Sequence, residues 1–195
     1  MRAAIYDEWL EKEISSNPET IVLHIGCGMD SRIERVSKQS KMWYDIDFPD
    51  VIEERRKYYA ETDTYHMLAV DMRTDAWKEY IEADQKAIIV LEGVSMYFNP
   101  EELNELLSNL AKHFDSVKIL MDCYTERAAK VSKYKNPIND VGVTTVYGYD
   151  KPEELAGKSG LVFVKEHDMT PPRFVEELQG MEKPLVVIEG DIIVG

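Results

Sequence analysis

Residues 21–34 read IVLHIGCGMDSRIE, an apolar run that ends in two glycines and continues into a helix-like segment. The first five residues have the apolar, β-branched character of a buried strand. Gly26 and Gly28 allow the backbone to approach a ligand closely, and the start of the next helix presents its amide groups to that ligand. Ser31 and Glu34 have the spacing of a helix capping box. The sequence therefore predicts a strand, a tight turn and a helix, with a ligand site at the carboxyl end of the strand.

The rest of the chain repeats the alternation of strand and helix. Further strands are expected at 42–47, 65–70, 87–91 and 117–123, and two late strands at 161–166 and 184–194 read as an antiparallel pair. Helices are expected around Ile5 and Trp9, from Asp50 with Glu53 as its capping partner to about Tyr59, after Asn99-Pro100, and at 125–132. Residues 136–150 read as a loop. We predict a single α/β domain over residues 1–195, with a mostly parallel central sheet and helices on both faces.

The composition excludes several classes of protein. Hydrophobic residues make up 44% of the 195, which suits a domain with a substantial core. The net charge of −14 opposes binding to nucleic acids or to anionic membranes. The longest purely apolar run, 87–91, is far shorter than the ~18 residues of a membrane span. The N-terminus lacks a signal-peptide pattern, and two cysteines are too few for a disulfide framework. We expect a reduced, cytoplasmic protein. Whether it forms a homo-oligomer stays open.

Acidic residues close four consecutive expected strands. Asp47 ends the second strand at about the 20-residue offset from the first glycine where an acid contacts the ribose of a nucleotide-like cofactor. Asp45 lies on the same side of the strand as Asp47, but farther from the end of the strand. Asp71, Glu92 and Asp122 follow the next three strands. For Asp71 a role as a helix cap stays equally open, whereas Glu92 is followed by a glycine and not by a helix, which favours a functional role.

The glycine turn also indicates which cofactor to expect. A dinucleotide site usually has the pattern Gly-x-Gly-x-x-Gly, but Ser31 stands at the third glycine position. The turn therefore disfavours NAD and FAD, and with them an oxidoreductase. A cofactor with adenine and ribose but no phosphates fits better, and S-adenosylmethionine is such a cofactor.

Three ordered motifs carry a resemblance to a known family. They are HIGCGMDSR at 24–32, WYDIDFP at 43–49 and EGVSMY at 92–97. Together they resemble the leucine carboxyl methyltransferase family, in particular the branch similar to polyketide-biosynthesis O-methyltransferases. The resemblance runs from about Arg2 to about Tyr124. It implies a Rossmann-like class I methyltransferase fold that uses S-adenosylmethionine.

The resemblance also implies which residues bind the cofactor. Those positions surround one bound molecule: Gly26, Cys27 and Gly28 along the methionyl part, Asp47 at the ribose hydroxyls, Asp71 and Met72 beside the adenine, Glu92 beside the methionyl amine, and Arg2 on the carboxylate. A guanidinium suits the last role because it can grip a carboxylate with two N–H groups.

One departure from the family concerns the N-terminus. Family members carry a long segment that helps to close the substrate pocket, whereas here Met1 immediately precedes the arginine. We expect that this lid is missing, or that another chain or a C-terminal insertion supplies it. The alternative function is therefore a non-catalytic S-adenosylmethionine-binding or regulatory protein with an incomplete substrate pocket.

The expected reaction is transfer of a methyl group to a carboxyl or hydroxyl oxygen of a small molecule, polyketide-like or another secondary metabolite. Such a transfer is an in-line displacement, so the protein must mainly align the two reactants and exclude water. A phenol acceptor would benefit from a base, and Tyr97 is the first candidate, with Asp122 second. An ordinary packing role for Tyr97 stays open. The histidines show no metal-ligand spacing, and His24 is expected to be a hydrogen-bonded core residue.

Overall fold

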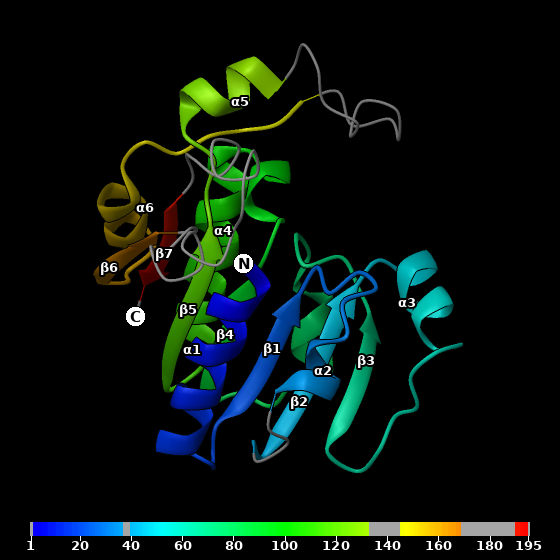
Figure 1. The fold of residues 1–195 in the computed structure, drawn as a ribbon. Helices are drawn as coiled ribbons and strands as arrows, with labels where there is room; N and C mark the ends of the chain where they lie inside the picture. The colour runs from blue at the N-terminus through cyan, green and yellow to red at the C-terminus, as the bar shows by residue number, and fades with distance from the viewer. Residues whose placement is uncertain (1, 37–39, 133–144, 169–189, 195) are drawn as a thin grey trace, which may run out of the picture.

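The computed structural model describes residues 2–36, 40–132, 145–168 and 190–194. Its centre is a seven-stranded sheet in the order β3-β2-β1-β4-β5-β7-β6 (Figure 1). The strands are β1 Ile21–Ile25, β2 Met42–Asp47, β3 Tyr65–Ala69, β4 Lys86–Leu91, β5 Ser116–Asp122, β6 Phe163–Asp168 and β7 Gly190–Val194. The first five are parallel, β7 is antiparallel to both β5 and β6, and the predicted late antiparallel pair is therefore confirmed.

Helices cover both faces of this sheet. They are α1 Arg2–Ser16, α2 Arg32–Arg35, α3 Pro49–Arg55, α4 Pro100–His113, α5 Glu126–Ser132 and α6 Pro152–Lys158, with 3-10 turns η1 Asp75–Glu79 and η2 Ser95–Tyr97. Figure 1 shows α1 in front of the sheet and α4 behind it. The predicted α/β fold with helices on both faces is confirmed.

The central strands are apolar on both faces, and this places a hydrophobic core on each side of the sheet. On β1, Val22 packs with α1 residues such as Leu10, whereas Leu23 packs with α4 residues such as Leu107. The side chains of Leu10, Val22, Leu23 and Leu107 are all fully buried. Because successive side chains of a strand point to opposite faces, continuous apolar runs such as the one in β4 are what a doubly covered sheet requires.

Both predicted capping boxes, at Ser31 and at Asp50, are wrong. Ser31 makes no capping hydrogen bond, and its hydroxyl instead accepts one from Arg35 at 2.8 Å. Helix α3 begins at Pro49 after the N-cap residue Phe48, so Asp50 lies inside the first turn, and the helix ends at Arg55 instead of near Tyr59. Proline is favoured at the first helical position, so the helix starts at Pro49 and not after Asp50.

The predicted helix cap at Asn99 is confirmed, and the structure shows that it is a full capping box with Glu102. The Asn99 side chain accepts from the amide of Glu102 at 2.9 Å, and the Glu102 carboxylate accepts from the amide of Asn99 at 2.8 Å. This cap starts α4, which packs four buried leucines against the sheet. Here the sequence had every signal within five residues: cap, proline and acids in the first turn.

The prediction missed α6, a seven-residue helix that is too short to show a clear apolar period. Its start did carry a signal, because Pro152 is followed by Glu153 and Glu154. The predicted loop is confirmed for residues 145–150, which form neither helix nor strand, and its first part lies outside the described residues. The same holds for the start of the last predicted strand, of which 190–194 are described.

None of the helices in the described ranges is both long and apolar enough to cross a membrane.

Candidate functional site

A cavity of about 250 Å³ opens at the carboxyl ends of β1, β2, β3 and β4. The strand order runs outward in both directions from β1 and β4, so the cavity lies where the order reverses. This is the expected ligand position in an open parallel sheet. Its lining comes from the last residues of β1 and β2 and from the segments that follow the four strands: Ile25, Gly26, Ile46, Asp47, Phe48, Val70, Asp71, Met72, Arg73, Gly93, Val94, Tyr97 and Phe98.

Gly26 is the residue of the glycine turn that lines the cavity, and it has less room for a side chain than Gly28. Its φ is +67°, and a Cβ placed there would lie 2.3 Å from a methyl carbon of Val94. Its amide donates to the carbonyl of Ile46 at 2.8 Å, which ties the turn to β2. A side chain at Gly26 would therefore both strain the backbone and displace a wall residue.

We expect Gly26→Ala to abolish measurable cofactor binding and to lower the melting temperature, because Val94 must move into the cavity. Gly28→Ala is the matched control, since Gly28 also has a positive φ, +50°, but a Cβ there meets nothing within 4 Å. It should cost only backbone strain of about 1–2 kcal/mol. Calorimetric titration with S-adenosylhomocysteine and thermal melts compare the two variants. Equal loss of binding in both would contradict the steric explanation.

The Asp47 carboxylate reaches the cavity already oriented. Its Oδ2 accepts from the amide of Gly28 and its Oδ1 from the amide of Phe48, both at 2.8 Å. A carboxylate offers about four lone-pair sites, so it keeps capacity for two hydroxyl donors. The structure thus brings Asp47 together with the predicted residues Gly26, Asp71 and Met72 in the lining of one cavity.

Cys27 and Gly28, both predicted to bind the cofactor, lie behind the cavity wall. The Cys27 side chain packs in the core on the α1 side, and its amide donates to the carbonyl of Ile46 at 3.3 Å. Gly28 donates to Asp47 and accepts from Arg55 at 3.0 Å. The two residues therefore shape the turn and hold Asp47, and neither belongs to the cavity lining.

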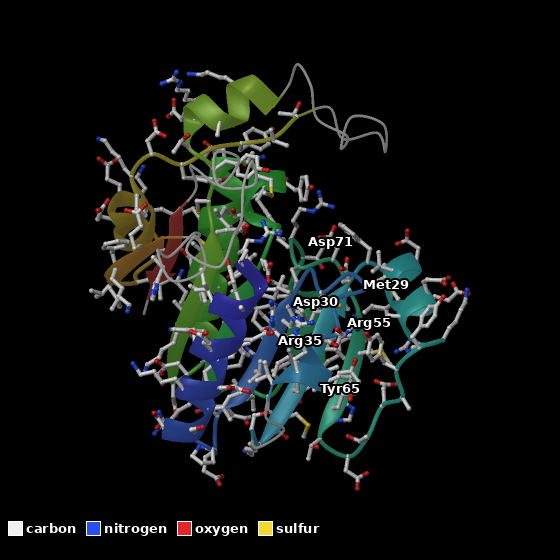
Figure 2. The ribbon with its side chains drawn as sticks, in the orientation of Figure 1. Met29, Asp30, Arg35, Arg55, Tyr65 and Asp71 are labelled. Atoms are coloured by element: carbon white, nitrogen blue, oxygen red, sulfur yellow. The ribbon has the colours of Figure 1, made fainter. Side chains whose placement is uncertain are left out.

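Asp71 and Arg73 form the outer rim of the cavity. The Arg73 guanidinium makes three contacts to the Asp71 carboxylate, the shortest at 2.7 Å, and its amide makes a fourth at 3.0 Å. These contacts hold the pKa of Asp71 below its ordinary value. The Arg73 guanidinium also lies 5.5 Å from the centre of the Phe48 ring. Thr74, and not Asp71, caps the following η1 turn, so the capping alternative for Asp71 is wrong. Figure 2 shows Asp71 and Met29 toward the same end of the sheet.

An ion cluster stands beside the cavity, next to the lining residue Gly93. Arg2 donates from Nε to Glu92 at 2.7 Å and from Nη1 to Asp122 at 2.9 Å. The amide of Gly93 donates to the other oxygen of Asp122 at 2.7 Å. Burial raises the pKa of Asp122, although Arg2 and the Gly93 amide oppose the shift. The structure therefore joins Arg2 and Glu92, which are 90 positions apart, at one end of the site.

Arg32 lies behind Glu92, and no role for it was predicted. Its side chain is fully buried and donates to Glu92, to Asp7 at 2.8 Å and to the Nε2 atom of His24 at 3.0 Å. A third carboxylate, that of Asp30, lies 3.2 Å from its Nη2 atom. The sequence signal for Arg32 was its place in the motif at 24–32. Its partners could not be predicted, because they belong to elements far apart in the chain.

His24 and Asp45 continue this network into the core. As predicted, His24 is a hydrogen-bonded core residue, with Nδ1 3.1 Å from Asp45 and Nε2 bonded to Arg32. Asp45 is fully buried and also accepts from Trp43 at 2.9 Å, Tyr65 at 2.7 Å and Arg55 at 3.0 Å. The sequence preference for Asp47 over Asp45 as a ligand agrees with this placement, because Asp45 does not line the cavity.

Tyr97, the predicted catalytic residue, lies in the cavity wall and is 40% exposed. Burial raises its pKa, the charge of Asp122 raises it further, and Arg2 lowers it. The phenol therefore carries its proton at neutral pH and is suited to donate a hydrogen bond to an acceptor. A catalytic role for Tyr97 stays a prediction.

Within the described ranges, no group of three or more His, Cys, Asp or Glu side chains is arranged to hold a metal ion.

Comparisons with known proteins agree with the geometry of the site. The family model described as leucine carboxyl methyltransferase matches residues 1–111. TcmP of Streptomyces glaucescens, a tetracenomycin polyketide synthesis O-methyltransferase, is 29% identical over 184 residues, which cover 93% of this chain and 68% of that protein. The S-adenosyl-L-methionine-dependent methyltransferase dpfgK of Gibberella zeae is 27% identical over 169 residues, which cover 79% of this chain and 57% of dpfgK.

The solved structures show the same fold. A SAM-dependent methyltransferase of Leishmania major superposes with a TM-score of 0.64 at 14% sequence identity, covering 98% of this chain and 72% of that one. The family model matches more than half of the chain and contains the loops that line the cavity. The chain is therefore a member of the leucine carboxyl methyltransferase family, with the fold and the S-adenosylmethionine cofactor of the class I methyltransferases.

Proposed function

We propose that this chain transfers the methyl group of S-adenosylmethionine to a carboxyl or hydroxyl oxygen of a small molecule. The observation that carries the proposal is the placement of two different polar groups at the cavity. Asp47 lines the cavity with spare acceptor capacity, and the cluster of Arg2 and Glu92 lies next to the lining residue Gly93. The Asp47 carboxylate suits the ribose hydroxyls of the cofactor, and the cluster of Arg2 and Glu92 suits its amino-acid end.

The residues present fit the cofactor. Gly26 lines the cavity without a side chain, so its backbone can approach the chain that joins ribose and sulfur. Phe48 and Met72 offer apolar surface beside the rim, which suits a purine ring. The acidic Glu92 suits an ammonium group, and Arg2 suits a carboxylate.

Bound S-adenosylmethionine supplies an electrophilic methyl group on a positively charged sulfur. The protein then has to hold the acceptor oxygen in line with that methyl group and to exclude water. A carboxylate acceptor needs no base. For a hydroxyl acceptor, Tyr97 at the cavity wall would orient the oxygen as a hydrogen-bond donor, and Asp122 nearby is the candidate to receive a proton.

The class of acceptor is part of the proposal. The name of TcmP describes an O-methyltransferase of polyketide synthesis, and its similarity extends over 93% of this chain. We extend that class, polyketide-like or other secondary metabolites, to this protein. The proposal also includes a cytoplasmic location, supported by Cys27 and Cys123, which are buried as thiols.

Binding of the cofactor is the first test. We expect calorimetry to give micromolar affinity for S-adenosylmethionine and S-adenosylhomocysteine, and a loss of about 100-fold in Asp47→Ala, because the ribose hydroxyls lose a charged acceptor. Asp50→Ala is the matched control: Asp50 is an exposed acid three positions further on, in α3. Absence of binding by the unmodified protein would overturn the proposal.

Methyl transfer is the second test. A panel of aromatic carboxylic acids and phenols is incubated with S-[methyl-³H]adenosylmethionine, and the labelled ester or ether is separated and counted. Label in a product supports the enzyme. Tight cofactor binding without transfer to any acceptor would favour the alternative, a non-catalytic S-adenosylmethionine-binding protein.

A further inference from the structure

Arg32 links Glu92 to the buried core of the protein. It is fully buried, and its guanidinium meets three carboxylates, those of Asp7, Asp30 and Glu92. The ring of Tyr6 lies 5.3 Å from its central carbon. Burying a guanidinium this fully is costly unless its N–H groups are paired, and each of its three nitrogens has a partner.

One terminal nitrogen of Arg32 contacts the proposed cofactor site, and the other contacts the core. Nη2 donates to the Oε2 atom of Glu92, whose other oxygen accepts from Arg2 at 2.7 Å. Nη1 faces the Nε2 atom of His24 at 3.0 Å. Both carboxylate oxygens of Glu92 are therefore held by arginines, one at the rim of the site and one behind it.

The contact with Arg32 assigns the hydrogen-bonding roles of the two His24 nitrogens. An arginine nitrogen can only donate, so Nε2 of His24 must accept, and the ring proton lies on Nδ1. Nδ1 then donates to the Oδ1 atom of Asp45 at 3.1 Å. Asp45 thereby sets the tautomer of His24, and His24 sets the plane of the Arg32 guanidinium.

The same aspartate also reaches the other end of the site. Asp45 accepts from Arg55, which donates to the carbonyl of Gly28 at 3.0 Å, and the amide of Gly28 donates to Asp47. The buried path is therefore continuous from Glu92 to Asp47. Among the described residues, the branch through His24 and Arg32 leads from Asp45 to the amino-acid end.

We propose that Arg32, aligned by His24, is a positioning residue that orients the Glu92 carboxylate toward the ammonium group of the cofactor. This inference rests on the proposed function, because it assumes that Glu92 meets that ammonium group. It adds two residues that touch neither cofactor nor acceptor but decide how tightly the amino-acid end is held.

The test compares two probes that differ in the amino-acid end. S-adenosylhomocysteine carries the ammonium and carboxylate groups, and adenosine lacks them. We expect Arg32→Lys and His24→Leu to weaken S-adenosylhomocysteine about 10-fold, the lower end of what loss of a residue behind a direct ligand costs in metal sites. Adenosine affinity should change less than about 2-fold, so the ratio of the two dissociation constants should shift.

Two further variants separate positioning from general stability. Arg35→Met removes a neighbouring arginine that pairs with the same Asp7 and Asp30 but not with Glu92 or His24, so the ratio should stay as in the unmodified protein. His24→Gln should recover most of the affinity lost in His24→Leu, because a glutamine amide can donate to Asp45 and accept from Arg32. If Arg32→Lys does not fold, the His24 pair alone gives the answer.

The outcomes are distinct. A proportional loss of both probes, or an unchanged ratio in Arg32→Lys and His24→Leu, overturns the positioning role while the proposed function stands. Failure of the unmodified protein to bind S-adenosylhomocysteine overturns the proposed function and this inference together.

Discussion

Asp45→Asn should lower the free energy of unfolding by about 3–5 kcal/mol, the cost of removing one partner of a buried ion pair. Arg55 is fully buried beside it, and an amide cannot balance the charge of that guanidinium. The substitution keeps the size of the side chain, so the loss reflects charge and hydrogen bonding instead of a cavity. Urea unfolding at pH 7 measures it. Asp63→Asn, at an exposed acid, is the control and should change stability by less than about 0.5 kcal/mol.

The same substitution should change the response to acid. Burial opposes the charge of Asp45, but His24 and Arg55 outweigh it and lower the pKa of Asp45 to about 2. A carboxyl group whose pKa is lowered by folding stabilises the protein above its ordinary pKa near 4 and loses that contribution as the pH falls through about 2. The contribution is about 2 kcal/mol at neutral pH. The stability difference between the unmodified protein and Asp45→Asn should therefore shrink between about pH 4 and pH 2, and a constant difference would contradict this.

Arg2→Met should weaken S-adenosylhomocysteine about 100-fold or more, the second large effect that we expect. Arg2 joins Glu92 and Asp122, and its loss leaves two carboxylates facing each other where the cofactor carboxylate must bind. Truncating one partner of a hydrogen-bonded charge pair typically costs about 2–5 kcal/mol, of which 2.7 corresponds to about 100-fold.

The control for Arg2→Met is Arg2→Lys, which keeps the charge but loses the forked geometry of the guanidinium. It should recover part of the affinity and not all of it. Adenosine, which has no carboxylate, should bind all three proteins about equally. Unchanged S-adenosylhomocysteine affinity in Arg2→Met would show that Arg2 serves only to pair Glu92 with Asp122.

Features encoded within a few neighbouring residues could be predicted from the chain. The strand at 21–25, the two glycines after it and the Asn99 cap of α4 appear in the structure where the sequence placed them. Asp47 was also recognised, because the carboxyl ends of parallel strands meet at one edge and its distance from the first glycine is set by one strand-helix-strand unit. Each of these depends on local periodicity, turn chemistry or fixed spacing.

The partners of buried polar side chains depended on how the elements pack. Arg32 and Glu92 are 60 positions apart, and Arg2 and Asp122 are 120 apart, so no short pattern relates them. The packing also gave Asp45 its buried partners, whereas Asp47, on the same side of the strand, lines the cavity. Local patterns determine where strands, turns and caps form, because their energies come from adjacent residues. Which charges meet is decided only when the sheet brings distant loops to one edge.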